Sequence, residues 1–152
     1  MLSFLLTISI FLPFTIQSCI NESFWSDELG TCVLPVEIAT SSISAELNCQ
    51  SLGGHLFSIH NAFENAAVAD LHTKKLTGQL GWIGGWFNSS VPTWLWYDET
   101  PFNYQHWVAS TEKGGCLYMD PRNNHDWRQI DCSGTFQYLC DLPPTTLTTP
   151  ST

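Results

Sequence analysis

The order of apolar and polar residues predicts two helices in the first half of the chain. The segment 43–52 repeats apolar residues at near-helical spacing, and the glycine pair at 53–54 supplies a C-terminal stop. Asn61 can cap a second helix, because Glu64 stands three residues later in the capping-box position. We expect this second helix to end at Gly78.

From residue 80 onward the helical period disappears and short strand-like runs replace it. A long stretch punctuated by Pro92, Asp98, Pro101 and Asn103 has little regular pattern, and long irregular loops inside compact domains are usually functional. Expected strands lie at 56–59, 82–85, 116–119, 126–131 and 136–140, beside a strand pair within 19–35. This order predicts an α+β domain, in which two helices pack on one side of short antiparallel β-sheets with a long irregular loop.

The first 18 residues, MLSFLLTISIFLPFTIQS, form an uncharged apolar leader. Their apolar stretch is shorter than the ~20 residues of a membrane-spanning helix, and Pro13 interrupts it. We therefore expect residues 1–18 to be a secretory signal peptide, with a retained membrane anchor as the alternative. Residues 19–141 then form one domain, and nothing later in the chain approaches the length of a membrane span. Residues 142–152 are a Thr/Pro-rich tail, either an O-glycosylated stalk or plain disorder.

Charge narrows the classes of partner that this chain, which we expect to be secreted and extracellular, can bind. Its 152 residues contain 5 basic and 14 acidic side chains, which give a formal net charge of −9. Nucleic acids need clustered Lys and Arg to replace counterions, and anionic membrane surfaces attract the same residues, so we expect neither as a partner. The acidic balance is compatible with a cation or a neutral polar ligand and selects neither.

Six cysteines follow the leader, and an even count behind a signal peptide indicates three disulfides made in an oxidising compartment. They are Cys19, Cys32, Cys49, Cys116, Cys132 and Cys140. Spacing alone leaves every pairing open. Zinc binding is the competing interpretation, but the chain has no C-x-x-C pair to support it.

Two Asn-x-Ser sequons, at Asn21 and Asn88, fit the secretory interpretation and predict a glycoprotein. Asn88 should lie in a polar turn that faces water. Asn21 stands two residues from Cys19, where a hairpin can crowd it. We therefore expect Asn88 to be glycosylated more reliably than Asn21.

Motifs of catalysis and metal binding are absent from the sequence. It contains no nucleophile elbow, no zincin motif, no phosphate-binding P-loop and no EF-hand loop. The histidines do not pair at helical i, i+4 spacing, so their default role is structural or superficial. They are His55, His60, His72, His106 and His125. Acidic residues are scattered as well, and we expect no enzyme activity, no cofactor and no metal.

Tryptophans interleaved with cysteines give the most specific pattern in the chain. The fragments are L-N-C-Q-S-L-G-G-H-L at 47–56, G-W-I-G-G at 81–85, W-L-W-Y-D at 94–98, Y-Q-H-W at 104–107, C-L-Y-M at 116–119, W-R-Q-I-D-C at 127–132 and Y-L-C at 138–140. Each fragment alone is weak, but the ordered set resembles the C-type lectin-like domain family. The resemblance covers residues 19–140, nearly the whole chain after the leader.

The resemblance implies a disulfide pairing that spacing could not supply. The implied pairs are Cys49–Cys140, Cys116–Cys132 and Cys19–Cys32. The first would tie the first helix to the last strand, and the second would lie beneath the long loop. The resemblance also assigns several residues to the core rather than to a ligand site, namely Trp82, Ile83, Gly84, Trp96 and Trp107.

The resemblance further implies a ligand on the long loop and the adjacent strand. Sugar-binding members of the family hold a bridging calcium with a Glu-Pro-Asn or Gln-Pro-Asp triplet in the loop and a Trp-Asn-Asp triplet before the third conserved cysteine. Here the loop reads V-A-S-T-E-K-G-G between Trp107 and Cys116, and Trp127 is followed by Arg128 and Gln129. We therefore expect no calcium at this principal sugar-linked site.

Polar side chains of the loop and its adjacent strand are the expected contacts with an extracellular ligand, although surface solvation is the ordinary alternative for each of them. The candidates are Glu99, Asn103, Glu112, Asn123, Asn124, Asp126, Arg128 and Gln129. Binding of a carbohydrate or glycoconjugate without the usual calcium site is the first hypothesis, because polar side chains and exposed aromatics can bind sugars directly. The alternatives are calcium-independent recognition of a protein ligand and a structural extracellular glycoprotein.

Overall fold

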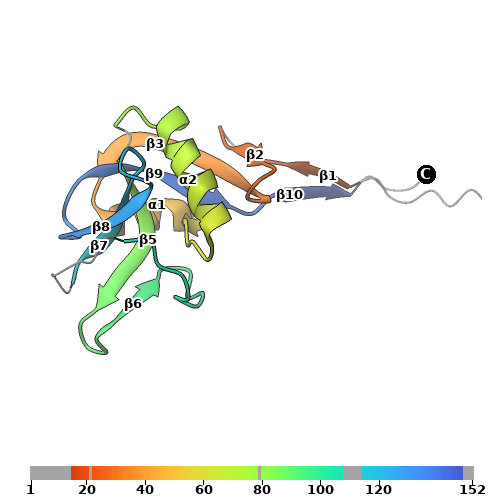
Figure 1. The fold of residues 1–152 in the computed structure, drawn as a ribbon. Coiled ribbons are helices and arrows are strands. Elements are labelled where there is room, and N and C mark those ends of the chain that lie inside the picture. Colours follow the sequence, from red (N-terminus) through yellow and green to blue (C-terminus); the bar gives the residue numbers. More distant parts are fainter. Residues whose placement is uncertain (1–14, 21, 79, 108–113, 149–152) are drawn as a thin grey trace, which may run out of the picture.

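Two helices flank one large sheet, and a narrow two-stranded ribbon extends from it (Figure 1). The computed structural model describes residues 15–20, 22–78, 80–107 and 114–148. The elements in chain order are β1 (Thr15–Ser18), β2 (Phe24–Ser26), β3 (Thr31–Thr40), α1 (Ser42–Ser51), β4 (His55–Leu56), α2 (Ala62–Lys75), β5 (Gly81–Asn88), β6 (Thr93–Trp96), β7 (Cys116–Asp120), β8 (Asp126–Ile130), β9 (Phe136–Leu142) and β10 (Thr145–Thr148). The domain is α+β, as the sequence predicts.

The large sheet has eight strands and is mixed rather than wholly antiparallel. Its order is β2-β3-β9-β5-β7-β8, with β4 beside β9 and β6 beside β5. The β5–β9 pair is parallel and places Trp82 opposite Tyr138, whereas the other pairs are antiparallel. The expectation of an antiparallel sheet is wrong for this pair, because a long connection through β6, β7 and β8 joins its strands where a hairpin would enforce opposite directions.

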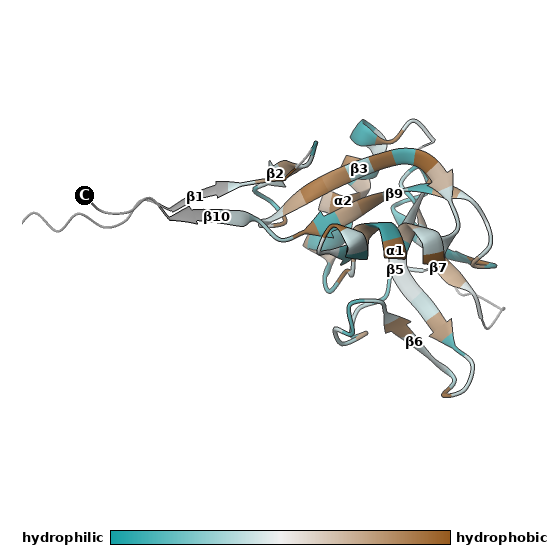
Figure 2. Cartoon of the chain, turned by 180° about the vertical axis from the view of Figure 1, so that it is seen from behind, coloured by the Kyte–Doolittle hydropathy of each residue, from teal (hydrophilic) through white to brown (hydrophobic). Residues whose placement is uncertain are grey.

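Successive residues of the central strands point to opposite faces of the sheet and build two separate cores. On β5, Trp82 joins the core that contains Cys49 of α1, whereas Ile83 joins the core that contains Val68 of α2. The helices therefore cover opposite faces: α2 lies in front of the sheet in Figure 1, and α1 lies in front in the reverse view of Figure 2. The expectation that both helices pack on one side is wrong, because strand alternation leaves two apolar faces to cover.

Helix α1 is rotated away from the apolar spacing that predicts it. Ile43 and Leu47 are 56% and 59% exposed. Two attachments fix the rotation instead. The buried Glu46 carboxylate accepts a hydrogen bond from the backbone N–H of Leu56 at 2.9 Å, and Cys49 carries a disulfide to β9. Apolar periodicity located this helix but did not identify its buried face.

Helix α2 begins where the capping box predicts. The Asn61 side-chain oxygen accepts from the backbone N–H groups of Phe63 and Glu64, each at 3.0 Å. The Glu64 carboxylate in turn accepts from the backbone N–H of His60 at 2.7 Å. Phe63 itself is 89% exposed, so polar caps rather than apolar packing hold the first turn.

Strand β6 lies in the stretch that we expect to be irregular. It pairs with the end of β5, so that Trp96 faces Gly85. The sequence pattern does not predict this strand, because its four residues, T-W-L-W, follow a proline and show little alternation of polar and apolar residues. The disulfides join the pairs that the family resemblance implies: Cys19–Cys32, Cys49–Cys140 and Cys116–Cys132.

The ribbon of β1 and β10 joins two segments that we expect to lie outside the domain. Thr15–Ser18 pairs antiparallel with Thr145–Thr148, and the Thr145 hydroxyl donates to the Ser18 carbonyl at 2.8 Å. Because β1 falls inside the expected leader, cleavage after Ser18 would remove this partner of β10. The boundaries at 18 and 142 stay predictions. Within the described ranges, no helix is both long enough and apolar enough to cross a membrane.

His72 of α2 fills a fully buried position without hydrogen bonds. Neither of its ring nitrogens has a partner among the described residues. The backbone of Gly81 on β5 lies against the ring, since a Cβ at Gly81 would come within 2.7 Å of His72 Cε1. Burial lowers the pKa of His72 to about 3, because apolar surroundings disfavour the charged imidazolium.

We expect acid to destabilise the fold through His72. Its folded pKa lies below the unfolded value of 6.5, so the stability that depends on the neutral ring is complete above pH 6.5 and is lost as the pH falls toward 3. The free energy of unfolding, measured with denaturant, should drop by about 2 kcal/mol between pH 7.5 and pH 5. The variant His72→Leu, which fills the site without a titrating group, should lose this drop. An unchanged drop in that variant would assign the pH dependence to another group.

Candidate ligand-binding site

The long loop after β6 crosses the outer strand β8 before it returns to β7. The backbone N–H of Trp127 donates to the His106 carbonyl at 2.8 Å, and Trp107 forms a parallel bridge with Trp127. The buried Trp127 indole also donates to Asn65 Oδ1 on α2 at 2.6 Å. One residue of β8 therefore joins the loop, the sheet and α2.

His106 connects this loop to the turn between β7 and β8. Its Nε2 lies 3.0 Å from the Asn124 carbonyl oxygen, and a carbonyl can only accept, so Nε2 carries the proton. Nδ1 of the neutral ring can then accept from the Tyr104 hydroxyl, 3.3 Å away. Desolvation raises the pKa of Tyr104, which keeps this hydroxyl protonated. Asp126 Oδ1 lies 3.9 Å from the same Nε2 and adds a carboxylate beside the ring.

The turn between β7 and β8 contains two consecutive residues in the left-handed region. Asn124 and His125 have φ angles of 55° and 60°, which asparagine tolerates better than histidine. Their carbonyl oxygens accept from His106 Nε2 at 3.0 Å and from Asn65 Nδ2 at 3.4 Å. Contacts from the loop and from α2 therefore hold the strained turn, and strain of this kind concentrates at ligand sites.

Asp120 anchors the start of the same turn. It is 5% exposed and accepts from Arg122 Nε at 3.1 Å and from Asn123 Nδ2 at 2.5 Å. Burial alone would raise the pKa of Asp120, but the hydrogen bonds from Arg122 and Asn123 outweigh it, so the pKa lies below its ordinary value. The positive charge of Arg122 is therefore paired with the Asp120 carboxylate within the turn.

Aromatic rings from β6 and from the loop itself form a continuous layer. Phe102 stacks on Trp96 with a centroid distance of 4.7 Å and on Trp107 with a distance of 5.7 Å. Trp94 stacks on the same phenyl ring at 6.4 Å. Trp96 is buried, as expected. Trp107, also expected in the core, packs against the core but is only half-buried, as are Trp94 and Phe102. The loop region thus combines partly exposed ring surfaces with polar groups.

A second polar cluster joins the loop to the segment between β4 and α2. The hydroxyls of Ser58 and Thr100 donate to Asp98 at 2.5 and 2.6 Å, so their oxygens can accept from His60 Nε2, which lies 3.2 Å from each. Asn103 Oδ1 lies 3.4 Å from the other ring nitrogen. Because Ser58 donates to a carboxylate rather than to the histidine, the cluster lacks the arrangement of an activated serine nucleophile.

The structure places seven of the eight candidate residues from the sequence in three regions, and the eighth lies outside the described residues. They are Glu99 and Asn103 in the loop, Asn123, Asn124 and Asp126 at the turn, and Arg128 and Gln129 on β8, with Glu112 outside the described residues. Strand alternation directs Arg128 to the face opposite Trp127. The same alternation places Arg128 on the face of β8 to which Asp126 also points.

Sequence reasoning missed His60 and His106, which lie at the centres of the two clusters. Neither histidine has a partner at helical spacing, which is why the sequence assigns them no role. Their partners are distant in sequence: Asn124 lies 18 positions after His106, and Asn103 lies 43 positions after His60. The aromatic neighbours of His106 in the Y-Q-H-W fragment were the one local signal of its environment.

The residues that the structure describes do not assemble a site for calcium, the ion that the family resemblance associates with sugar binding. Among the described residues, no group of three or more His, Cys, Asp or Glu side chains is arranged to hold a metal ion. Asp120 is already engaged by Arg122 and Asn123, and Arg128 brings a fixed cation to β8. Calcium takes about six to eight oxygen ligands, so the described part of the site offers too few.

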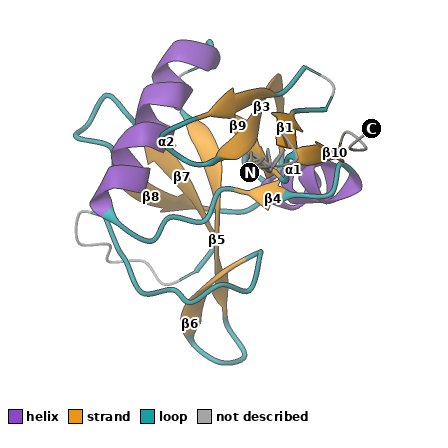
Figure 3. Cartoon of the chain, turned by 90° about the vertical axis from the view of Figure 1, so that its right-hand side faces the viewer, coloured by secondary structure: helices purple, strands orange, loops and turns teal. Residues whose placement is uncertain are grey.

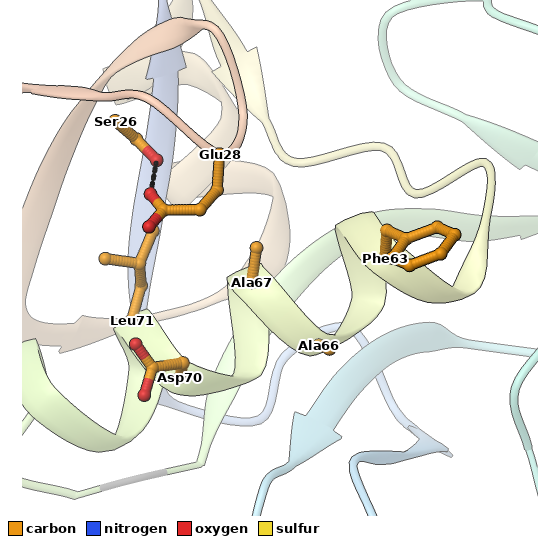
Figure 4. Close-up of a pocket in the computed structure, with 7 residues that line it drawn as sticks. All are labelled: Ser26, Glu28, Phe63, Ala66, Ala67, Asp70 and Leu71. Carbon is orange, nitrogen blue, oxygen red and sulfur yellow. Dashed lines mark hydrogen bonds between the residues drawn. The ribbon is translucent and has the colours of Figure 1, made fainter.

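A separate groove of about 510 Å³ runs along the outer face of α2 (Figure 4). Phe63, Ala67 and Leu71 supply its apolar lining, and Glu28 and Asp70 supply its charged groups. Lys74 Nζ lies 2.7 Å from Asp70 Oδ2, so this carboxylate is already paired. The groove contains none of the candidate residues and is distinct from the loop and turn clusters.

Comparison with known proteins relates this geometry to a family. The Lectin C-type domain matches residues 39–142. Ladderlectin of Oncorhynchus mykiss is 31% identical over 118 residues, which are 74% of this chain and 62% of ladderlectin, so the match spans less than two thirds of that protein. A type-2 ice-structuring protein of Hemitripterus americanus is 28% identical over 122 residues, with 78% and 72% covered. A solved calcium-independent type II antifreeze protein has a TM-score of 0.71 at 25% identity and covers 86% of this chain and 98% of its own.

We expect calcium to leave the stability of the protein unchanged. A site with millimolar affinity would add about 1.4 kcal/mol in ~10 mM calcium and would raise the Tm by several degrees. Thermal unfolding in calcium and in chelator, at matched ionic strength, should therefore give the same midpoint. A saturable rise that Glu112→Ala or Asp131→Ala removes, and that the distant control Glu37→Ala retains, would contradict this expectation.

Proposed function

The chain belongs to the C-type lectin domain family, and we propose that it is an extracellular recognition module that binds carbohydrate or glycoconjugate without the family's usual calcium bridge. The proposed site comprises the long loop and the turn between β7 and β8, with His106 at their junction. The single observation that supports it most is the strained turn held by His106 beside half-buried aromatic rings.

The chemistry of this junction suits a polar, hydroxyl-rich ligand. Asp126 supplies a carboxylate acceptor, and the amide of Asn124 can both donate and accept. The half-buried Trp107 packs against Trp127, the residue that follows Asp126, and its ring can cover the apolar face of a sugar while polar groups bind the sugar hydroxyls. Few oriented polar groups beside aromatic surface are typical of small-ligand sites.

The same junction explains how binding would proceed without calcium. In a calcium-bridged site the ion both orders the loop and contacts the ligand. Here the His106 hydrogen bond to Asn124 and the backbone bond from Trp127 join the loop to the turn. The protein can therefore present the ligand-binding groups in a preorganised arrangement, which reduces the entropy lost on binding.

Extracellular action and the absence of catalysis are parts of the same proposal. Several relatives are named as lectins or ice-structuring proteins, which supports binding rather than turnover. The His60 cluster lacks the order of an activated nucleophile, which agrees with a binding role. Six cysteines in three disulfides suit a secreted chain.

Two other ligand classes compete with carbohydrate. One is a protein ligand recognised without calcium, which would make the domain a protein-interaction module. The other is ice, because a type-2 ice-structuring protein is among the relatives. A structural role as an extracellular glycoprotein is a separate alternative. Thermal hysteresis of the purified protein distinguishes these hypotheses. An ice-binding protein produces thermal hysteresis, whereas a protein that binds only a soluble sugar or a protein does not.

A glycan array, probed in calcium and in chelator, tests the proposal directly. We expect sugar-competed binding of equal strength in both buffers. Asp126→Asn, which removes the carboxylate beside His106, should weaken that binding by about tenfold, a loss of ~1.4 kcal/mol. The matched control Glu37→Gln on the exposed part of β3 removes one carboxylate elsewhere and should leave binding unchanged.

Three outcomes would contradict the carbohydrate proposal. The absence of binding to any glycan on the array, in both buffers, would favour a protein ligand. Binding that chelator abolishes would restore a calcium site. Equal weakening by Asp126→Asn and Glu37→Gln would move the binding surface away from the turn.

A further inference from the structure

The β5–β6 hairpin projects from the sheet as a separate finger (Figures 1 and 3). Its last paired residues are Asn88 and Thr93, and residues 89–92 form the exposed tip. The sequon Asn88-Ser89-Ser90 therefore lies where the finger ends, away from both cores. The carbohydrate-binding proposal does not use this tip.

The side chain of Asn88 is already oriented by the turn. Its Oδ1 accepts from the backbone N–H of Ser90 at 3.0 Å and from that of Val91 at 3.4 Å. Because the oxygen and nitrogen of a carboxamide diverge from its trigonal carbon, these bonds to Oδ1 leave Nδ2 pointing away from the Ser90 and Val91 N–H groups. The neighbouring Ser89 and Ser90 are exposed, so a large substituent on Nδ2 meets solvent rather than protein.

The same tip exposes apolar surface. Val91 is 64% exposed and is followed by the exposed Pro92. Below them, Phe87 and Trp94 pack edge to face at 5.4 Å, and both rings are half-buried. Apolar groups gathered on a projecting hairpin favour self-association unless something polar covers them.

We propose that Asn88 carries an N-linked glycan and that this glycan covers the apolar tip of the hairpin. A lipid-linked oligosaccharide is the donor. A bond forms between Asn88 Nδ2 and the anomeric carbon of the first sugar, the bond from that carbon to the lipid pyrophosphate breaks, and Nδ2 loses one proton as the lipid pyrophosphate leaves. The Ser90 hydroxyl completes the acceptor sequence, and the bulky product stays in solvent.

Paired serine variants test the site without altering the turn. The full chain is expressed in mammalian secretory cells, and glycosidase digestion with peptide mapping then assigns each glycan. Ser90→Ala removes the sequon but keeps the backbone N–H that Asn88 accepts, whereas the control Ser89→Ala keeps the sequon. We expect wild type and Ser89→Ala to carry a glycan at Asn88 and Ser90→Ala to lack it. Wild-type protein with an unmodified Asn88, whether or not Asn21 is modified, would overturn the proposal.

Self-association measures the covering role. Size-exclusion chromatography should show more oligomer for Ser90→Ala than for Ser89→Ala at equal concentration. Adding Val91→Ser to Ser90→Ala should return the protein to the monomer fraction of Ser89→Ala. Identical elution of Ser90→Ala and Ser89→Ala would overturn the covering role. Neither readout depends on which ligand the loop binds.

Discussion

The disulfide between Cys49 and Cys140 is the constraint on which the rest of the structure depends. It ties α1 to β9, and β9 pairs with β3, β4 and β5. The bridge joins residues 91 positions apart, so it strongly restricts the unfolded chain, and loss of such a bond typically costs ~2–5 kcal/mol. Together with the Glu46 hydrogen bond, it sets the rotation of α1, leaves Ile43 and Leu47 in solvent and closes one of the two cores. The opposite face is then available to α2.

The second core leads directly to the ligand-binding junction. Trp127 is buried in this core, and its indole N–H donates a hydrogen bond to Asn65 of α2. Its backbone N–H donates to the His106 carbonyl and so holds the loop against β8. Tyr104 and Trp107 pack against the same indole with centroid distances of 5.7 and 6.1 Å. The loop is irregular, but its described part is held by the core rather than by regular hydrogen bonding of its own.

The sequence predicts those elements whose signals are local. The capping box of Asn61 and Glu64 located the start of α2, because the bonds that make it span only a few residues. Features that depend on distant partners were missed or misjudged. The buried face of α1 depends on a bond to β9, and the parallel pair in the sheet depends on a connection through three other strands. His106 acquires its role only when folding brings it to Asn124, and no local pattern encodes that contact.

Amide hydrogen exchange at Trp127 tests most directly whether the protein, rather than calcium, holds the loop to the turn. This N–H donates to the His106 carbonyl, so its protection reports the junction itself. We predict slow exchange in chelator, no further slowing in calcium, and at least ~10-fold faster exchange in His106→Ala, while the amide of Leu139 in β9 stays protected. Fast exchange at Trp127 that only calcium suppresses, or exchange that His106→Ala leaves unchanged, would contradict this account of the site.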